Sequence, residues 1–192
     1  MYEASEDPYC YPGTTVLINK LNIREQDRLQ EFEAEITRER SGDPIPITRP
    51  AVKRFQAVHR HLFQDVYAWA GKFRTVRISK GGNMFCYPEQ IESQLAALFR
   101  WLGDRQFLRG LSADEFSVDA AHFLAELNAI HAFRDGNGRA QLAFMALVAA
   151  YAGHPLDFGL LVPDPFLSAM IESFAGDERL LASQLRMMLP AA

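Results

Sequence analysis

The sequence predicts a mainly α-helical fold with one β-hairpin, built as a single domain over residues 1–192. Apolar residues recur at helical spacing through most of the chain, a pattern typical of amphipathic helices. One segment, 73–86, instead alternates apolar and polar residues on one side of a glycine pair, which is typical of a hairpin. Because 48% of the 192 residues are hydrophobic and no repeat is present, we expect one buried core.

The first segment, residues 1–23, is expected to form an arm rather than a helix. Proline and glycine are dense between Asp7 and Gly13, which prevents regular helical hydrogen bonding. Tyrosines in the same stretch predict that the arm packs on the body of the protein.

Two helices are predicted next. Residues 23–40 are charged, with apolar residues at helical spacing, and predict a surface helix. After a proline-rich loop we expect a second helix, with Thr48 as its N-cap and Pro50 in its first turn. His59 and His61 lie on this second helix, and we interpret both as structural or solvated rather than as metal ligands.

The hairpin is predicted from a strand over 73–80, a turn at Gly81-Gly82-Asn83 and a return strand over 84–86. An isolated pair of strands has unpaired edges. It is either a surface decoration or a flap that takes an incoming peptide by strand addition. We favour the flap.

The rest of the chain predicts helices. Their segments are 88–102, 116–130, 142–151, 163–175 and 177–189. Ser112 and Glu115 have the spacing of a capping box at the start of the second of these. The segment 142–151 is apolar almost all round and is expected at the buried centre.

Composition excludes several classes of protein. The net charge of −4 and the pI near 5.7 argue against a broad nucleic-acid-binding surface. No apolar run has the length of a membrane span, and the first residues do not resemble a signal peptide. Two cysteines without metal-ligand spacing suit a reducing compartment. We expect a cytoplasmic protein, or one exported without a cleavable signal.

The stretch from His131 to Gln141 separates two apolar helical segments and contains a glycine-rich turn. Gly136 and Gly138 allow a ligand to approach the backbone closely, because no Cβ is in the way. The turn opens a helix, whose free N–H groups and positive dipole end favour an anion such as phosphate. The turn is therefore a candidate phosphate site.

Four polar side chains surround this turn. His131 can take a proton near neutral pH, and Asp135 can hold a hard cation such as Mg²⁺. Asn137 can donate to a phosphate oxygen, and Arg139 can form a forked contact with phosphate. Arg134 is expected to face solvent. A lone histidine at a helix end is often only a cap, but the full set indicates transfer of a phosphate-bearing group from a nucleotide to an acceptor activated by His131.

The stretch resembles the Fic motif, H-x-F-x-[DE]-G-N-G-R-x-x-R. Every fixed position matches except the last, where Leu142 replaces the arginine, and Ala132 stands where proline is usual. The segment 7–23 resembles the N-terminal arm of many Fic toxins and effectors, and the segment 71–88 resembles the Fic flap. The resemblance covers most of the chain.

This resemblance implies a protein adenylyltransferase of a bacterial toxin or effector, with ATP as substrate and Mg²⁺ as cofactor. His131 would be the catalytic base, Asp135 the metal ligand, and Arg139 a ligand of the leaving pyrophosphate. Asn137 and the backbone of 136–139, with Gly136 and Gly138, would stabilise the transferring phosphate. The flap residues that would dock the target are Ile78, Ser79, Lys80, Gly81 and Gly82.

Three other functions stay open. The same scaffold can transfer another phosphate-containing group, although Gly136 and Gly138 favour the adenylylating branch over the Doc kinases, whose turn reads A-N-K. A degenerate domain could bind nucleotide or a partner without turnover, which Leu142 favours and the intact His131 and Asp135 disfavour. A nucleotide hydrolase is disfavoured by the flap. The implied target is a bacterial type II topoisomerase or, after delivery into a host cell, a host GTPase.

Fic enzymes are commonly inhibited by a helix with the pattern [ST]-x-x-x-E-[GN], whose glutamate pairs with the closing arginine. The nearest match, residues 168–173, lacks the final residue, and we interpret it as structural. An inhibitor, if present, is then expected to be a separate small antitoxin-like protein. With Leu142 in place of the closing arginine, Arg139 is the only motif arginine left to receive a glutamate.

Overall fold

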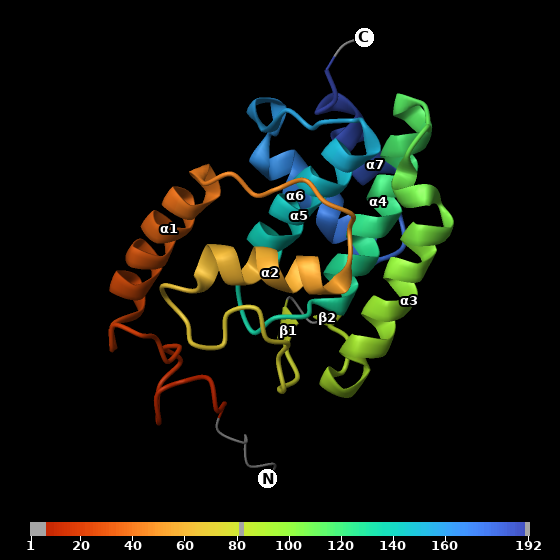
Figure 1. Ribbon diagram of the computed structural model, residues 1–192. Coiled ribbons are helices and arrows are strands. Elements are labelled where there is room, and N and C mark those ends of the chain that lie inside the picture. Colours follow the sequence, from red (N-terminus) through yellow and green to blue (C-terminus); the bar gives the residue numbers. More distant parts are fainter. Residues whose placement is uncertain (1–6, 81–82, 191–192) are drawn as a thin grey trace.

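A computed structural model describes residues 7–80 and 83–190 and shows a helical fold with a single short hairpin (Figure 1). The predicted fold class is therefore confirmed. The α-helices are α1 (Gln26–Gly42), α2 (Val52–Phe63), α3 (Ile91–Asp104), α4 (Ala113–Ile130), α5 (Asn137–Ala152), α6 (Pro163–Phe174) and α7 (Arg179–Met187). The strands are β1 (Ser79–Lys80) and β2 (Asn83–Met84), and short 3₁₀ turns are η1 (Pro88–Gln90), η2 (Gln106–Leu108) and η3 (Phe158–Leu160).

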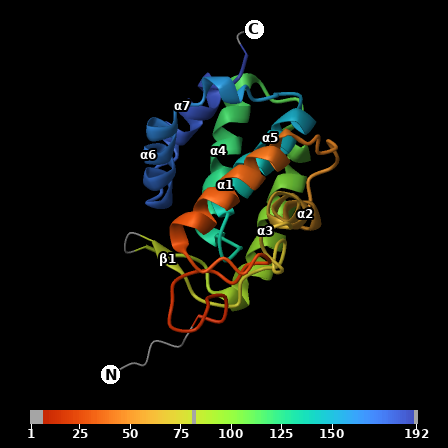
Figure 2. The ribbon, with the colours of Figure 1, turned by 90° about the vertical axis from the view of Figure 1, so that its left-hand side faces the viewer.

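Helix α4 is the central element of the bundle. It packs against α3, α5, α6 and α7. In Figure 2, α6 and α7 lie on one side of α4, while α2 and α3 lie on the other. The hairpin, the N-terminal arm and the loop between α4 and α5 lie at the same end of the molecule (Figures 1 and 2). Residues distant in sequence are thus brought to one end of a rigid bundle.

Aromatic side chains fill the core where α2, α4 and α5 meet. Phe55, Phe123, Phe133 and Phe144 are fully buried. Phe55 stands 5.0 Å from Phe133 and 5.3 Å from Phe144 between ring centroids. Since Phe133 belongs to the loop after α4, this cluster fixes the loop to the helices. None of the helices among the described residues has the length and hydrophobicity of a membrane-spanning helix.

The helix boundaries follow the sequence pattern with one clear error. Ser112 and Glu115 form the predicted capping box, with the Ser112 N–H donating to Glu115 Oε2 at 2.9 Å. Thr48 is not a cap, because α2 begins at Val52 after an extended Ala51.

The hairpin is shorter than the sequence predicts. Among the residues that the structure describes, the ladder consists of the pairs Ser79–Met84 and Lys80–Asn83, whereas the segment 73–78 is not a strand. Arg74 explains this difference. Its buried guanidinium donates to the carbonyls of Val76, Cys86 and Ile130 and so holds the base of the hairpin without a ladder.

Candidate active site

His131 ends α4 and begins the loop that leads into α5. Its backbone is left-handed, with φ of 48° and ψ of 62°, which turns the chain sharply away from the helix axis. Its N–H still donates to the carbonyl of Leu127 at 3.2 Å, and its carbonyl accepts from Arg74 Nε at 2.7 Å. These bonds fix the histidine from both sides.

The imidazole of His131 is held in one tautomer. Its Nδ1 lies 3.1 Å from the carbonyl oxygen of Asn128, which can only accept, so Nδ1 carries the proton. This leaves a lone pair on Nε2. Asn128 thus braces the histidine through its backbone carbonyl.

Burial keeps this imidazole uncharged. It lowers the pKa of His131 to about 4, and the positive charges of Arg74 and Lys80 act in the same direction. The ring of Phe85, just after β2, is stacked on the imidazole at a centroid distance of 3.8 Å and an angle of 15°. At neutral pH His131 is therefore a neutral group ready to accept a proton.

Asn137 shapes the loop from within. The residue is 3% exposed; its Oδ1 accepts from the Phe133 N–H at 2.9 Å, and its Nδ2 donates to the Phe133 carbonyl at 2.8 Å. Its amide thus closes the turn in which Phe133 and Asn137 are four residues apart. The sequence led us to expect that this side chain contacts phosphate directly. Its hydrogen bonds to Phe133 already account for an asparagine at this position.

His59 of α2 braces the same loop and was interpreted from the sequence only as structural or solvated. It is fully buried; its Nδ1 accepts from the Gly71 N–H, and its Nε2 is 2.9 Å from the Asp135 carbonyl. Because Nδ1 accepts, Nε2 must donate to that carbonyl. Burial lowers the pKa of His59 to about 4, so this neutral tautomer persists at neutral pH.

The two glycines of the turn serve different needs. Gly136 has φ of +76°, and a Cβ there would come within 2.3 Å of Phe63 Cζ. The absence of a side chain at this position is therefore required by the protein itself, not only by a ligand. A Cβ on Gly138 would meet no atom within 4 Å, so this residue leaves the start of α5 open to solvent.

The start of α5 has the properties of an anion site. The N–H groups of residues 137–139 lie in its first turn, and none has a hydrogen-bond partner recorded among the described residues. The Gly136 N–H is instead used by Asp135 Oδ1. Free donors and the positive end of a long helix together favour phosphate at this position.

Asp135 borders a hollow of about 220 Å³ beside this helix start. The other residues that line the hollow are Leu17, Gln26, Leu29, Gln30, Glu33, Tyr67 and Arg139. The carboxylate of Asp135 is exposed, and only its Oδ1 has a recorded partner. It retains oxygen lone pairs for a hard cation. The contributions of the arm and α1 to this hollow were not predicted from the sequence.

Arg139 points from α5 to α1 and is paired there. Its Nη2 donates to Glu33 Oε1, its Nη1 donates to Thr37 Oγ1 at 3.3 Å, and its guanidinium lies 4.7 Å from the Phe63 ring centre. The other oxygen of Glu33 accepts from the Tyr67 hydroxyl. Burial and Glu33 raise the pKa of Tyr67 strongly, so this hydroxyl remains a donor.

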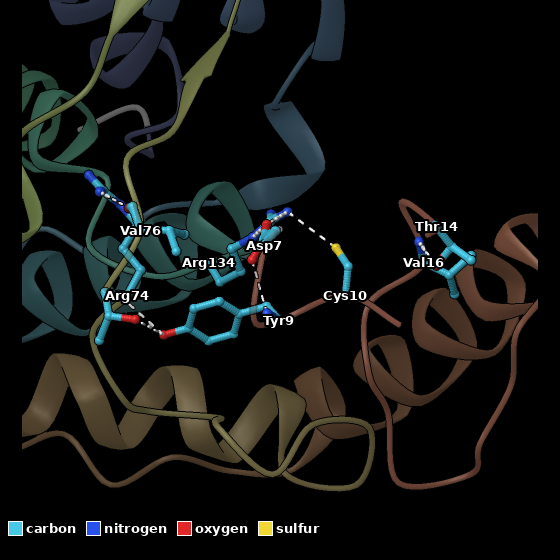
Figure 3. A network of polar contacts seen from close by, with 9 residues as sticks. Asp7, Tyr9, Cys10, Thr14, Val16, Arg74, Val76 and Arg134 are labelled. Carbon is cyan, nitrogen blue, oxygen red and sulfur yellow. Dashed lines mark hydrogen bonds and ion pairs between the residues drawn. The ribbon is translucent and has the colours of Figure 1, made fainter. Parts of the chain in front are cut away.

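Arg134 does not face solvent, contrary to the sequence expectation. Its Nε donates to Asp7 Oδ2 at 2.8 Å, and its Nη2 lies 3.9 Å from Cys10 Sγ (Figure 3). From the same arm, the Tyr9 hydroxyl accepts from the Thr75 N–H at 3.2 Å. The arm therefore contacts both the loop and the base of the hairpin, which confirms that it packs on the body.

The hairpin lies close enough to affect the loop electrostatically. Lys80 is exposed on β1, and its charge contributes to the lowered pKa of His131. Ser79 is also exposed, and the Ile78 carbonyl accepts from the Phe85 N–H. Gly81 and Gly82, which the sequence predicts in the docking turn, lie outside the described residues.

Solved structures share this architecture. The BepC protein, a VirB-translocated effector from Bartonella tribocorum with bound AMPPNP, aligns with a TM-score of 0.84 and 26% identity over 96% of this chain and 97% of that one. The N-terminal Fic domain of a VirB-translocated effector from Bartonella quintana with bound ADP gives 0.87 and 27% identity over 95% and 94%.

Sequence relatives agree with the structural ones. A probable protein adenylyltransferase of Sinorhizobium fredii, y4lH, is 49% identical over 98% of both chains. The protein adenylyltransferase VbhT of Bartonella schoenbuchensis is 38% identical over 96% of this chain, which spans only 39% of that protein. Residues 48–149 match the sequence model of the Fic/DOC family. The chain belongs to the Fic/DOC family.

Proposed function

We propose that this protein is a protein adenylyltransferase that transfers AMP from ATP to a Tyr, Thr or Ser hydroxyl of a target protein. One observation carries the proposal: a neutral His131 with a free Nε2 begins the same loop that ends in the unpaired N–H groups of α5. A base for the hydroxyl and a cradle for the phosphate are thus six residues apart. The names of the relatives, protein adenylyltransferases, support the same activity.

The residues divide the reaction between them. His131 Nε2 takes the proton of the target hydroxyl as its oxygen attacks the α-phosphorus. The bond from the α-phosphorus to the bridging oxygen breaks, and pyrophosphate leaves. The N–H groups of residues 137–139 hold the phosphate oxygens on which charge develops. Arg139 lies at the same end of α5 and can hold the β-phosphate side of the leaving group.

Mg²⁺ fits the residues beside this cradle. Mg²⁺ is usually held by one or two carboxylates together with water and substrate phosphates. Asp135 offers an exposed carboxylate with oxygen lone pairs available, on the hollow next to the phosphate site. When bound, the ion would neutralise negative charge on the triphosphate. Asp135 would hold it.

The hairpin is the proposed docking element for the target. Residues 78–80 reach the edge of a two-stranded sheet, which an extended peptide can join by strand addition. The charge of Lys80 is close enough to influence His131, so a peptide on this strand would pass near the base. Gly81 and Gly82 would complete the docking turn.

The two target classes implied by the resemblance to Fic toxins and effectors are kept as the proposed targets. Bacterial type II topoisomerases suit a toxin that acts in its own cytoplasm, and host GTPases suit an effector delivered into a host cell. Two of the similar structures are of VirB-translocated effector proteins. Labelling bacterial and host lysates with an ATP analogue, followed by capture and mass analysis, separates the two. A small antitoxin-like protein is proposed as an inhibitor, because Glu172 of the 168–173 segment is exposed and Arg139 pairs with Glu33 instead.

The decisive test compares His131→Ala with His61→Ala, a histidine outside the loop. With ATP labelled at the α-phosphate, His131→Ala is expected to lose transfer by about 10²-fold or more while ATP affinity is kept. His61→Ala should label normally. Near-normal labelling by His131→Ala would contradict the proposal. ATP binding without any transfer by the unmodified protein would favour the degenerate domain.

The metal assignment needs its own experiment. Asp135→Asn keeps the size of the side chain but removes its charge. Its activity is expected to need far more Mg²⁺ than that of the unmodified protein, measured as the Mg²⁺ concentration at half-maximal labelling. An unchanged Mg²⁺ requirement would exclude Asp135 as the ligand. The intact mass of the product distinguishes AMP from any other transferred group.

A further inference from the structure

Three ligand-bearing side chains meet on the face of the bundle formed by α4 and α7. His122 and Glu126 are one helical turn apart on α4, and Glu178 caps the start of α7. One ligand atom from each lies within 4.8 Å of the other two. The group shares no residue with the loop that follows α4.

Among the described residues, a single ion pair is recorded within this group. His122 Nδ1 lies 3.1 Å from Glu178 Oε1. The carboxylate of Glu126 has no ion pair or hydrogen bond recorded among the described residues. Even a protonated imidazole offers one positive charge against two carboxylates. A divalent cation would remove this imbalance.

The geometry is close to that of a coordination site. Ligand atoms at zinc distances of about 2.0–2.2 Å, in tetrahedral directions, stand roughly 3.4 Å apart. The His122–Glu178 pair already has nearly this separation, and the exposed Glu126 side chain can close the remaining gap by a rotamer change. The Trp101 ring, 4.8 Å from the imidazole between centroids, limits how far His122 can turn away.

We propose that His122, Glu126 and Glu178 bind a divalent first-row transition ion of the zinc class. The imidazole nitrogen selects such an ion over Mg²⁺, which takes oxygen ligands. The ion joins α7 to α4 at a point nine residues before His131, about 13 Å along the helix. It has no part in the transfer reaction. Its effect is to clamp the helix whose end positions the base.

Titration of the metal-free protein with ZnCl₂, followed by calorimetry and by thermal unfolding, tests the proposal. Saturable binding with a Kd in the micromolar range and a rise in Tm are expected. His122→Ala should bind one ion fewer than the unmodified protein. Glu126→Gln, at an exposed position that leaves the fold intact, should weaken the same event at least about tenfold.

Glu92→Gln is the matched control, because it removes an exposed helical carboxylate on α3, outside the group. It should bind zinc as the unmodified protein does. MgCl₂ should not bind at this site. Any change in Tm that MgCl₂ causes should therefore be the same in Glu126→Gln as in the unmodified protein. Equal zinc stoichiometry and affinity in Glu126→Gln and Glu92→Gln would overturn the proposal. So would the absence of saturable zinc binding.

Discussion

The buried carboxylate of Glu33 accepts hydrogen bonds from Arg139 and from Tyr67, so that α1 is tied to the start of α5. The two members of the ion pair are unequally solvated. The Glu33 side chain is 10% exposed, whereas the Arg139 side chain is 42% exposed. Removing one partner therefore has different consequences from removing the other.

Arg139→Ala is expected to destabilise the protein more than Glu33→Gln does, by about 1–2 kcal/mol. Loss of the arginine leaves a nearly buried charge with only a tyrosine hydroxyl, whereas loss of the carboxylate charge leaves a guanidinium that water can reach. Urea unfolding of both variants at pH 7.5 measures the difference. Tyr67→Phe, which keeps the ion pair, is the control. Equal costs for the two substitutions would contradict this asymmetry.

Gly136→Ala and Gly138→Ala are expected to have opposite effects on stability. At Gly136 a Cβ would overlap Phe63 on a backbone with positive φ, so we expect a loss of about 2–4 kcal/mol. At Gly138 a Cβ meets nothing and alanine favours a helix, so stability should rise by up to about 1 kcal/mol. Thermal unfolding of both variants checks the contrast.

Gly138→Ala should nevertheless bind ATP more weakly than the unmodified protein. The added methyl group would occupy the open surface at the start of α5, where the phosphate is proposed to lie. An ATP titration followed by calorimetry measures this loss. Unchanged affinity in a stable Gly138→Ala protein would place the phosphate elsewhere.

Acid is expected to destabilise the protein through His59 and His131. Burial lowers both pKa values to about 4, against about 6.5 for an unfolded histidine. Between these values the unfolded chain binds protons that the folded protein does not, so stability falls as the pH falls. From pH 7.5 to 5.5 each histidine should cost about 1.4 kcal/mol.

Urea unfolding at the two pH values measures this effect. His131→Ala removes one of the two groups that take up a proton on unfolding, so its loss of stability over the same interval should be smaller by about 1.4 kcal/mol. His61→Ala, which leaves both groups in place, should behave as the unmodified protein does. An identical pH dependence in all three proteins would mean that burial does not hold His131 neutral.

The hairpin is expected to matter for the target and little for ATP. Ser79→Pro removes a backbone N–H from β1 and should reduce target labelling about tenfold or more, with the Kd for ATP changed less than about twofold. Ser79→Ala, which keeps the backbone donor, is the control and should label normally. Parallel loss of labelling and of ATP binding in Ser79→Pro would show that the hairpin is structural.

The sequence predicts those parts of the candidate site that lie close together in the chain. His131, Asp135 and Arg139 belong to a single turn whose residue types alone indicate phosphate chemistry. The groups that hold this turn come from elsewhere. Glu33 is separated from Arg139 by 106 residues. The only local signal for Glu33 was its position four residues after Leu29, on the buried face of α1.

Other errors had the same origin. Arg134 was expected in solvent because its partner, Asp7, lies 127 residues away in the arm. The strand over 73–80 was overestimated because alternation in sequence does not reveal that a buried Arg74 satisfies the carbonyls around it. Phe85 carried no signal of its own, since stacking on His131 depends on the return of the hairpin to the end of α4. Local patterns predict elements, whereas these contacts depend on the assembled fold.

Leu142 marks the one fixed position at which the motif is incomplete, and its replacement supplies the last prediction. It lies three residues after Arg139 on α5, partly buried beside the core, so the two side chains project from neighbouring positions. Leu142→Arg would place a second guanidinium next to the phosphate site. We expect ATP to bind about tenfold more tightly, which corresponds to about 1.4 kcal/mol, with a modest loss of stability from the missing apolar contact. Leu142→Met keeps the side chain apolar and should leave ATP affinity unchanged.

The arginine of Leu142→Arg would also restore a partner for an inhibitory glutamate. A co-expressed small inhibitor should therefore restrain Leu142→Arg more strongly than the unmodified protein. If Leu142→Arg binds ATP no better and is inhibited no more strongly, the closing arginine is not the contact that this chain lacks.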